Sequence, residues 1–314
     1  MVADRRRTQH RTDHRVRPPW GVRKGMQHQL SERARTQSSE RPSRPRVSVV
    51  VPTLNEARNL EVVLPELVAA VPDLHEVIVV DGRSVDDTLE TARRLLPDAV
   101  TCQQARRGKG NALATGFAKV TGDVVVMFDA DGSADPAEIP AFVRALTDGA
   151  DFAKGSRFND GGGSADITPI RRAGNEFLNT VVNRAFRTRF SDLCYGYNAF
   201  WADQLPVLDL PDHRRPGPPD GSMLWGDGFE IETVINCRFA AAGVRITEVP
   251  SVERLRIFGS SNLHAVKDGL RVLRTIRTER TRARRAGHRA LQGRTSRSAH
   301  VGRHSGTSVS RLAS

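Results

Sequence analysis

Two carboxylates stand together directly after an apolar run in this sequence of 314 residues. The run covers residues 124–128, and Asp129 and Asp131 follow it with one residue between them. Oxygen ligands of this kind are those that Mg²⁺ and Mn²⁺ prefer, usually completed by phosphate oxygens and water. The pattern predicts a divalent metal site at Asp129 and Asp131. The plainer interpretation is a solvated acidic turn ahead of Pro136.

Two other apolar runs also end in polar residues. One closes with residues 52–56, Pro-Thr-Leu-Asn-Glu, and the other closes with Asp81. A carboxylate at the position of Asp81 can accept hydrogen bonds from a base or from ribose hydroxyls. Ser84 or Asp86 is also expected to cap the helix that follows, and this role is compatible with nucleotide binding nearby.

Residues 106–111, Arg-Arg-Gly-Lys-Gly-Asn, combine three cations with two glycines ahead of a predicted helix. This composition suits a pyrophosphate group at a helix N-terminus, and Lys109 is predicted to bind the nucleotide-sugar. The spacing matches neither the phosphate loop of nucleoside triphosphatases nor the dinucleotide-binding fingerprint. Kinase and dehydrogenase functions are therefore disfavoured.

Short apolar strands that alternate with helices of 10 to 15 residues predict a mainly parallel sheet covered by helices on both faces. In such α/β sheets, ligands bind outside the carboxyl ends of the strands, where the polar segments above converge. Beyond residue 155 the alternation stops, which predicts a second, C-terminal acceptor lobe. The expected strands are 47–51, 75–80, 100–103, 123–128, 151–154 and 244–249, and the expected helices are 57–70, 86–96, 108–120, 136–146, 170–186, 229–242 and 262–277.

Charge is distributed unevenly along the chain. Residues 1–46 carry 13 Lys and Arg against 4 Asp and Glu, and residues 277–314 carry 10 against 1. Because neither segment has a hydrophobic period, both are predicted to be disordered basic tails. The remaining residues, 47–276, carry 25 basic and 31 acidic side chains, so they lack the basic surface of a specific nucleic-acid-binding protein.

Several other classes of protein are disfavoured by the composition. No apolar stretch is long enough for a membrane span, and no signal peptide is recognisable, although Met26 is a second candidate start. Three widely spaced cysteines are typical of reduced thiols in a cytoplasmic protein. The histidines lack the spacing of metal ligands, so a histidine metal centre is not expected.

The motifs together resemble family 2 glycosyltransferases of GT-A fold. The segments that carry this resemblance are 49–56, 80–88, 108–112 and 129–131. Segments 155–158, 192–196, 228–232, 249–250 and 256–261 further resemble the branch of polyprenyl-phosphate sugar synthases, which includes the dolichyl-phosphate mannose and glucose synthases. The resemblance covers residues 47–276 and implies a nucleotide-sugar-binding half, 47–155, and an acceptor half, 156–276.

The resemblance also implies roles for single residues. Pro52, Asn55, Glu56 and Asp81 match positions that hold the nucleotide. Asp129 and Asp131 match the positions for Mg²⁺ or Mn²⁺ and the diphosphate, and Arg157 and Arg256 match basic positions around the phosphates, which makes these four the expected catalytic residues. The chain departs from the family at Ser133, where Gln is frequent, and at Asn262, where Lys is usual.

The resemblance implies transfer of a hexose from a GDP- or UDP-linked donor to a polyprenyl phosphate, with inversion. Such an acceptor is already anionic and needs no general base. An alternative is a hydroxyl acceptor, for which a carboxylate must remove the proton. Asp227 and Glu230 are then the candidate bases, with helix capping as their other interpretation. The expected location is cytoplasmic and peripheral, at the inner face of the cell membrane, with the basic tails binding the anionic membrane surface.

Overall fold

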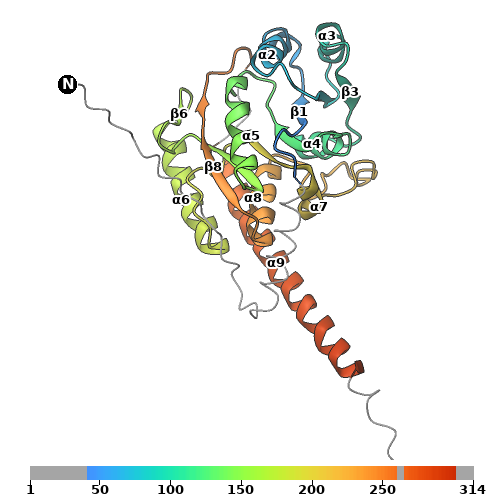
Figure 1. Cartoon of the computed structure of the whole chain (residues 1–314), viewed down its shortest axis with the longest axis vertical. Coiled ribbons are helices and arrows are strands. Elements are labelled where there is room, and N and C mark those ends of the chain that lie inside the picture. Colours follow the sequence, from blue (N-terminus) through green and yellow to red (C-terminus); the bar gives the residue numbers. More distant parts are fainter. Residues whose placement is uncertain (1–40, 260–264, 302–314) are drawn as a thin grey trace, which may run out of the picture.

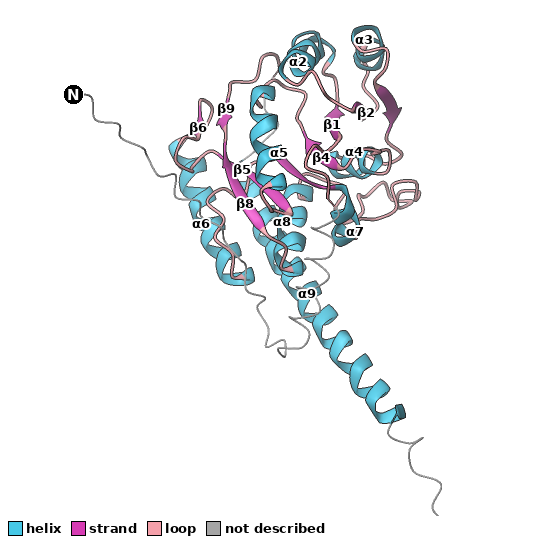
Figure 2. Ribbon diagram, viewed as in Figure 1, coloured by secondary structure: helices cyan, strands magenta, loops and turns pink. Residues whose placement is uncertain are grey.

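The computed structural model describes residues 41–259 and 265–301. Its centre is a seven-stranded sheet of order β3-β2-β1-β4-β7-β5-β8, with helices packed on both faces (Figures 1 and 2). A two-stranded sheet, β6-β9, lies beside it. The strands are β1 (Val47–Thr53), β2 (Glu76–Asp81), β3 (Val100–Gln103), β4 (Val124–Met127), β5 (Phe152–Ser156), β6 (Gly163–Ser164), β7 (Asn198–Trp201), β8 (Ile246–Pro250) and β9 (Val252–Glu253).

The helices cover the sheet in two layers. Val49 and Val51 of β1 belong to the hydrophobic core under α2 and α5, whereas Val50 belongs to the core under α4, α6 and α8. Successive strand residues point to opposite faces, so a strand covered on both sides is apolar throughout. The α-helices are α2 (Ala57–Ala70), α3 (Thr88–Leu95), α4 (Lys109–Phe117), α5 (Ile139–Thr147), α6 (Pro169–Phe186), α7 (Leu205–Leu208), α8 (Ile231–Ala242) and α9 (Ala265–Val301), and two 3₁₀ turns are η1 (Pro136–Glu138) and η2 (Ala202–Gln204).

Strand directions confirm the mainly parallel sheet. β1 pairs in parallel with β2 and β4, β2 with β3, and β5 with β8. β7 was not predicted, and it runs antiparallel to both β4 and β5. This strand of four residues comes from the predicted acceptor half and lies between β4 and β5 of the first half, so both predicted halves contribute to one sheet.

Structured residues continue beyond both predicted domain boundaries, 46 and 276. Arg41 forms an ion pair with Asp151 at 2.6 Å and another with Asp203 at 2.9 Å, so the folded part begins before residue 47. At the other end, α9 continues to Val301, and its Glu279 is 2% exposed and paired with Arg238. The remaining parts of the predicted tails, residues 1–40 and 302–314, lie outside the described residues.

None of the helices in the described ranges has the length and hydrophobicity needed to cross a membrane. The visible end of α9 projects away from the sheet as a single helix (Figure 1). Its packed part contacts α6 and α8, where Ile276 is buried in the core.

Candidate active site

The carboxyl ends of β1, β2 and β4 meet at one edge of the sheet. Thr53 pairs with Asp81 at the end of the β1–β2 ladder, and the Phe128 amide donates to the Val50 carbonyl at 3.0 Å. Asp129 and Asp131 follow immediately, so the sheet brings together the three polar strand ends that the sequence singled out.

Asp131 is held by residues from the far end of the chain. Arg256 Nη2 lies 2.7 Å from Asp131 Oδ2, and the Ile257 amide donates to the Asp131 carbonyl at 3.0 Å. The other carboxylate oxygen accepts from the Ser133 amide at 3.0 Å and from the Ser133 hydroxyl at 2.6 Å. Ser133 therefore supports the Asp131 carboxylate directly.

Asp129 forms a second cluster of charges. Lys109 Nζ lies 2.7 Å from Asp129 Oδ1 and 2.6 Å from Glu232 Oε1. Desolvation opposes the charge on Lys109, but the two carboxylates raise the pKa of its amine well above the usual range. The pKa of the Asp129 carboxyl is raised. Desolvation is the largest cause, and repulsion from Glu232 and Asp131 adds to it, so together they outweigh the attraction of Lys109.

Glu56 adds a fourth carboxylate to the site. Its Oε1 lies 3.3 Å from Arg256 Nη1, so Arg256 bridges Glu56 and Asp131. Desolvation raises the pKa of Glu56, although Asn59 and Arg256 stabilise the carboxylate. Within the part of the chain that the structure describes, these contacts join four carboxylates and two cations, which leaves a local charge of −2.

The residues at this site fit a divalent cation. Asp129 and Asp131 supply hard oxygen donors, and the local charge of −2 attracts a dication. Within residues 41–259 and 265–301, no group of three or more His, Cys, Asp or Glu side chains is arranged to hold a metal ion. The two aspartates would therefore need phosphate oxygens or water as further ligands.

The predicted nucleotide-binding residues lie at the same edge. Asp81 is buried, and its carboxylate accepts from the backbone amides of Arg83 at 3.0 Å and Ser84 at 3.2 Å. Asn55 has a left-handed backbone with φ 58°, accepts from the Val85 amide at 2.9 Å and donates its own amide to Ser84 Oγ. Pro52 pairs with Val80 in the β1–β2 ladder, so these residues shape the loop beside Asp129.

Asp86, one of the two predicted capping residues, contacts the start of α3, although the N-cap position of this helix is Asp87. Its Oδ1 accepts from the amide of Thr88, the first residue of α3, at 3.2 Å. Its Oδ2 also accepts from the Ala57 amide at 3.2 Å, which ties α2 to the loop before α3.

The first turn of α4, where the sequence predicts a pyrophosphate site, contacts the loop before α8. The amides of Gly110 and Asn111 donate to the carbonyl of Asp227 at 2.7 and 3.3 Å. A Cβ atom at Gly110 would lie 1.8 Å from the Gly226 carbonyl oxygen, so the loop before α8 covers this helix end completely. Lys109 reaches Asp129 from this segment, whereas Arg106 turns away and pairs with Asp227.

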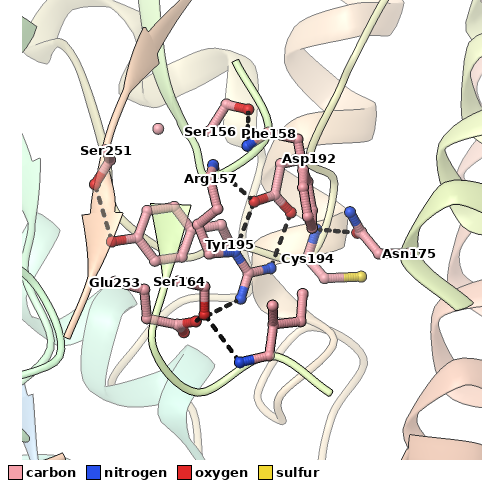
Figure 3. Close-up of polar contacts among 12 residues, drawn as sticks. Ser156, Arg157, Phe158, Ser164, Asn175, Asp192, Cys194, Tyr195, Ser251 and Glu253 are labelled. Carbon is pink, nitrogen blue, oxygen red and sulfur yellow. Dashed lines mark hydrogen bonds and ion pairs between the residues drawn. The ribbon is translucent and has the colours of Figure 1, made fainter. Parts of the chain in front are cut away.

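Arg157 lies in a buried network of its own, drawn in Figure 3. It donates to Asp192 through Nε at 2.7 Å and Nη2 at 3.0 Å, and to Glu253 at 3.0 Å. Its guanidinium also lies 4.9 Å from the ring centre of Tyr195. Its carboxylate partners thus differ from those of Arg256.

The two candidate bases are both engaged by neighbouring groups. Asp227 is 1% exposed, and Arg106 binds its two carboxylate oxygens at 2.6 and 2.9 Å. Glu230 Oε1 accepts from the amides of Gly226 and Gly228. Glu232, on the first turn of α8, was not singled out from the sequence, yet it contacts Lys109 beside Asp129. Glu232 therefore belongs to the cluster of charges around Asp129.

Comparison with known proteins identifies the family. The sequence model of glycosyl transferase family 2 matches residues 48–203. An undecaprenyl-phosphate mannosyltransferase of Micrococcus luteus is 32% identical over 229 residues, which cover 69% of this chain and 87% of that protein. The chain belongs to glycosyl transferase family 2. A dolichol-phosphate mannosyltransferase of Pyrococcus furiosus is 31% identical over 224 residues, which cover 69% of this chain but 59% of the Pyrococcus protein.

Solved structures show the fold of this family 2 glycosyltransferase. Glucosyl-3-phosphoglycerate synthase of Mycobacterium tuberculosis, in complex with Mn²⁺, UDP and glucosyl-3-phosphoglycerate, superimposes with a TM-score of 0.57 at 21% identity. The match covers 84% of this chain and 87% of the other. The predicted GT-A fold and the predicted enzyme class, a glycosyltransferase, are both confirmed.

Proposed function

We propose that this glycosyltransferase moves a hexose from a nucleotide-diphospho-sugar to a polyprenyl phosphate, with inversion at the anomeric carbon. The observation that carries the proposal is the pair Asp129 and Asp131 at the end of β4, with Lys109 and Arg256 bound to them at 2.7 Å each. Relatives named for mannosyl transfer to undecaprenyl phosphate and dolichol phosphate support the choice of acceptor.

The donor would lie along the carboxyl edge of the sheet. Pro52, Asn55, Glu56 and Asp81 shape the loops on which the nucleoside would rest, and the diphosphate would lie near Asp129 and Asp131. A bound Mg²⁺ or Mn²⁺, held by the two aspartates, would offset negative charge that develops on the nucleotide diphosphate as it departs. Lys109 is the side chain placed to contact the diphosphate from α4.

The reaction itself would be a single displacement. An acceptor phosphate oxygen forms a bond to the anomeric carbon while the bond from that carbon to the donor diphosphate breaks. A phosphate monoester is anionic near neutral pH, so no side chain needs to remove a proton. Of the two arginines that the resemblance places at the phosphates, we assign Arg256 to them because it lies against Asp131, whereas Arg157 is paired with Asp192 and Glu253.

A second candidate function is transfer to a hydroxyl group. Glu232 supports it, because this carboxylate lies 2.6 Å from the Lys109 amine that also binds Asp129. Structural neighbours solved with phosphoglyceric acid share the fold. In that reaction Glu232 would accept the hydroxyl proton. The enzyme would then need this carboxylate, whereas a phosphate acceptor would not.

The donor can be identified by measuring thermal stability with GDP- and UDP-sugars in the presence of Mn²⁺. A true donor at 100 times its dissociation constant should stabilise the protein by about 2.7 kcal/mol. Transfer of the labelled hexose from that donor is then measured to a polyprenyl phosphate, to the matching polyprenol and to phosphoglycerate. We expect transfer to the polyprenyl phosphate, retained in Glu232→Gln because the amide oxygen can still accept from Lys109. Transfer only to a hydroxyl acceptor, abolished in Glu232→Gln, would contradict the proposal.

The protein would meet such an acceptor at the cytoplasmic face of the membrane. A polyprenyl chain remains in the bilayer, so the enzyme must work at its surface. The basic residues near the two ends of the chain, among them the 10 Lys and Arg in residues 1–40, are the groups we assign to binding anionic lipid.

A further inference from the structure

The loop between α7 and α8, residues 209–230, lies over the first turn of α4. It places its backbone against α4 so closely that two glycines are required there. A Cβ atom at Gly108 would lie 2.2 Å from the Asp227 carbonyl oxygen, and one at Gly110 would lie 1.8 Å from that of Gly226. Lys109 stands between these glycines, and Glu232 follows the loop on α8. The loop therefore determines how Lys109 and Glu232 meet.

Arg106 fixes one side of this loop. Two of its nitrogens bind the Asp227 carboxylate, and Nη1 donates to the carbonyls of Asp212 at 2.8 Å and Arg215 at 2.5 Å. Asn111 of α4 adds a bond from Nδ2 to the His213 carbonyl at 3.3 Å. These contacts attach the loop to α4.

α9 fixes the other side through one buried carboxylate. Glu279 Oε1 accepts from the indole N–H of Trp225 at 2.8 Å, and both Glu279 oxygens accept from Arg238 at 3.0 Å. Arg238 in turn donates to the carbonyl of Asp209, where the loop begins, at 2.8 Å. A charged acceptor in a buried site gives strong hydrogen bonds, so Glu279 anchors the loop at both Trp225 and Asp209.

We propose that Glu279 and Trp225 are positioning residues for the active site. They hold the 209–230 loop against α4 and thereby keep Lys109 between Asp129 and Glu232. The contacts run without a gap from Glu279 to Trp225, through Gly226 and Asp227 to the first turn of α4. α9 is thus part of the catalytic apparatus, although its sequence resembles a basic tail. This inference rests on the proposed function only in the experiments that measure nucleotide binding.

The test uses a substitution that removes one N–H group. Trp225→Phe deletes the bond to Glu279, and Trp201→Phe is the matched control, because it deletes the bond from Trp201 Nε1 to the Ala150 carbonyl elsewhere in the fold. We expect Trp225→Phe to weaken Mn²⁺-dependent binding of UDP or GDP about fivefold to tenfold, which is less than the full value of one hydrogen bond to a charged acceptor because Lys109 keeps its own two ion pairs. Trp201→Phe should leave this affinity unchanged even if its melting temperature falls.

A double variant shows whether the effect passes through Lys109. In the Lys109→Ala background, Trp225→Phe should cause no further loss of nucleotide affinity, because the residue being positioned is absent. Glu279→Gln, which retains an acceptor oxygen but not the charge, provides a second variant if Trp225→Phe folds poorly. Wild-type nucleotide affinity in both variants, or an equal loss in the Lys109→Ala background, would overturn the proposal.

A readout that does not depend on the reaction separates this inference from the proposed function. The rate at which acetic anhydride modifies Lys109, followed by mass spectrometry, should rise in Trp225→Phe and in Glu279→Gln but not in Trp201→Phe. If the wild type binds neither nucleotide with Mn²⁺, the proposed function fails while this labelling result still stands. An unchanged labelling rate in both variants would show that the loop does not position Lys109.

Discussion

Arg256 donates to Asp131 across 2.7 Å and joins the loop after β9 to the end of β4. Two backbone bonds support this contact, from the Arg254 amide to the Ser133 carbonyl at 2.8 Å and from the Ile257 amide to Asp131 at 3.0 Å. The segment that carries the cation is therefore fixed beside the carboxylate before any ligand binds. A fixed cation at this point contributes to catalysis without the cost of ordering it during the reaction.

Asp131→Asn should abolish Mn²⁺-dependent nucleotide binding and leave the fold intact. The amide has the shape of the carboxylate, and its one carbonyl oxygen can still accept from Ser133, but it lacks the second acceptor oxygen and the charge that a hard dication needs. Calorimetric titration of nucleotide with and without Mn²⁺ measures the effect, and Asp98→Asn at an exposed position is the control. Unchanged Mn²⁺ dependence in Asp131→Asn would end the metal assignment.

Arg256→Ala should lower kcat/KM by a factor that corresponds to about 1.5 to 3 kcal/mol, the value of a charge-assisted hydrogen bond. Its side chain is partly exposed, so the melting temperature should change little. Arg256→Lys keeps the charge but cannot bridge Glu56 and Asp131 in the same way, and we expect intermediate activity. Steady-state kinetics with the donor concentration varied measures kcat/KM. A wild-type kcat/KM in Arg256→Ala would contradict the assignment of Arg256 to the phosphates.

Arg157→Ala should instead act mainly on stability. It would leave Asp192, which is 0% exposed, as a buried carboxylate without its cation. Breaking a buried ion pair from one side costs about 3 to 5 kcal/mol of unfolding free energy. Denaturant unfolding measures this cost, and Arg157→Met combined with Asp192→Leu should recover most of it. Wild-type stability in Arg157→Ala, with activity lost, would place Arg157 at the phosphates as the family resemblance implies.

Gly196→Ala should reduce activity more than stability. A Cβ atom there would lie 2.3 Å from Glu232 Oε1, and this flexible side chain can move aside only by leaving Lys109. Gly174→Ala is the matched control, because nothing lies within 4 Å of the added atom and the position is inside α6. The control should be more stable by about 0.5 to 1 kcal/mol. Equal activity of the two variants would show that Glu232 can be displaced freely.

The sequence predicted where the two aspartates after β4 lie, because local rules determine their position. An apolar run followed by two aspartates has one reasonable place in an α/β sheet, and Asp129 and Asp131 lie there. Glu232 was missed for the opposite reason. Its contact with Lys109 joins segments 123 positions apart, and no local pattern distinguishes it from Glu230, two residues before it.

The same distinction explains the errors in the fold. β7 has four residues and no turn signal at its ends, so its place between β4 and β5 depends entirely on tertiary pairing. The basic composition of α9 concealed a helical spacing that is visible in retrospect. Ile276 and Glu279 are buried, and Val272 and Ala283 are partly buried, on the face that packs against the domain. The prediction of a disordered tail after residue 276 followed the basic composition and not this weak helical spacing of apolar residues.

The last prediction concerns attachment to the membrane. Residues 2–40 carry 10 Lys and Arg against 4 Asp and Glu, an excess of 6, and each cation near an anionic leaflet contributes up to about 1 kcal/mol within a Debye length of about 8 Å. Co-sedimentation with acidic liposomes should therefore fall when residues 2–40 are deleted, and it should weaken at high salt. Arg41 is kept because it pairs with Asp151, and α9 is kept because Glu279 pairs with Arg238. Donor binding by the truncated protein should equal that of the full chain, which confirms that the fold is unharmed. Equal sedimentation of the two proteins, or binding that salt does not change, would show that the N-terminal cations do not hold the enzyme at the membrane.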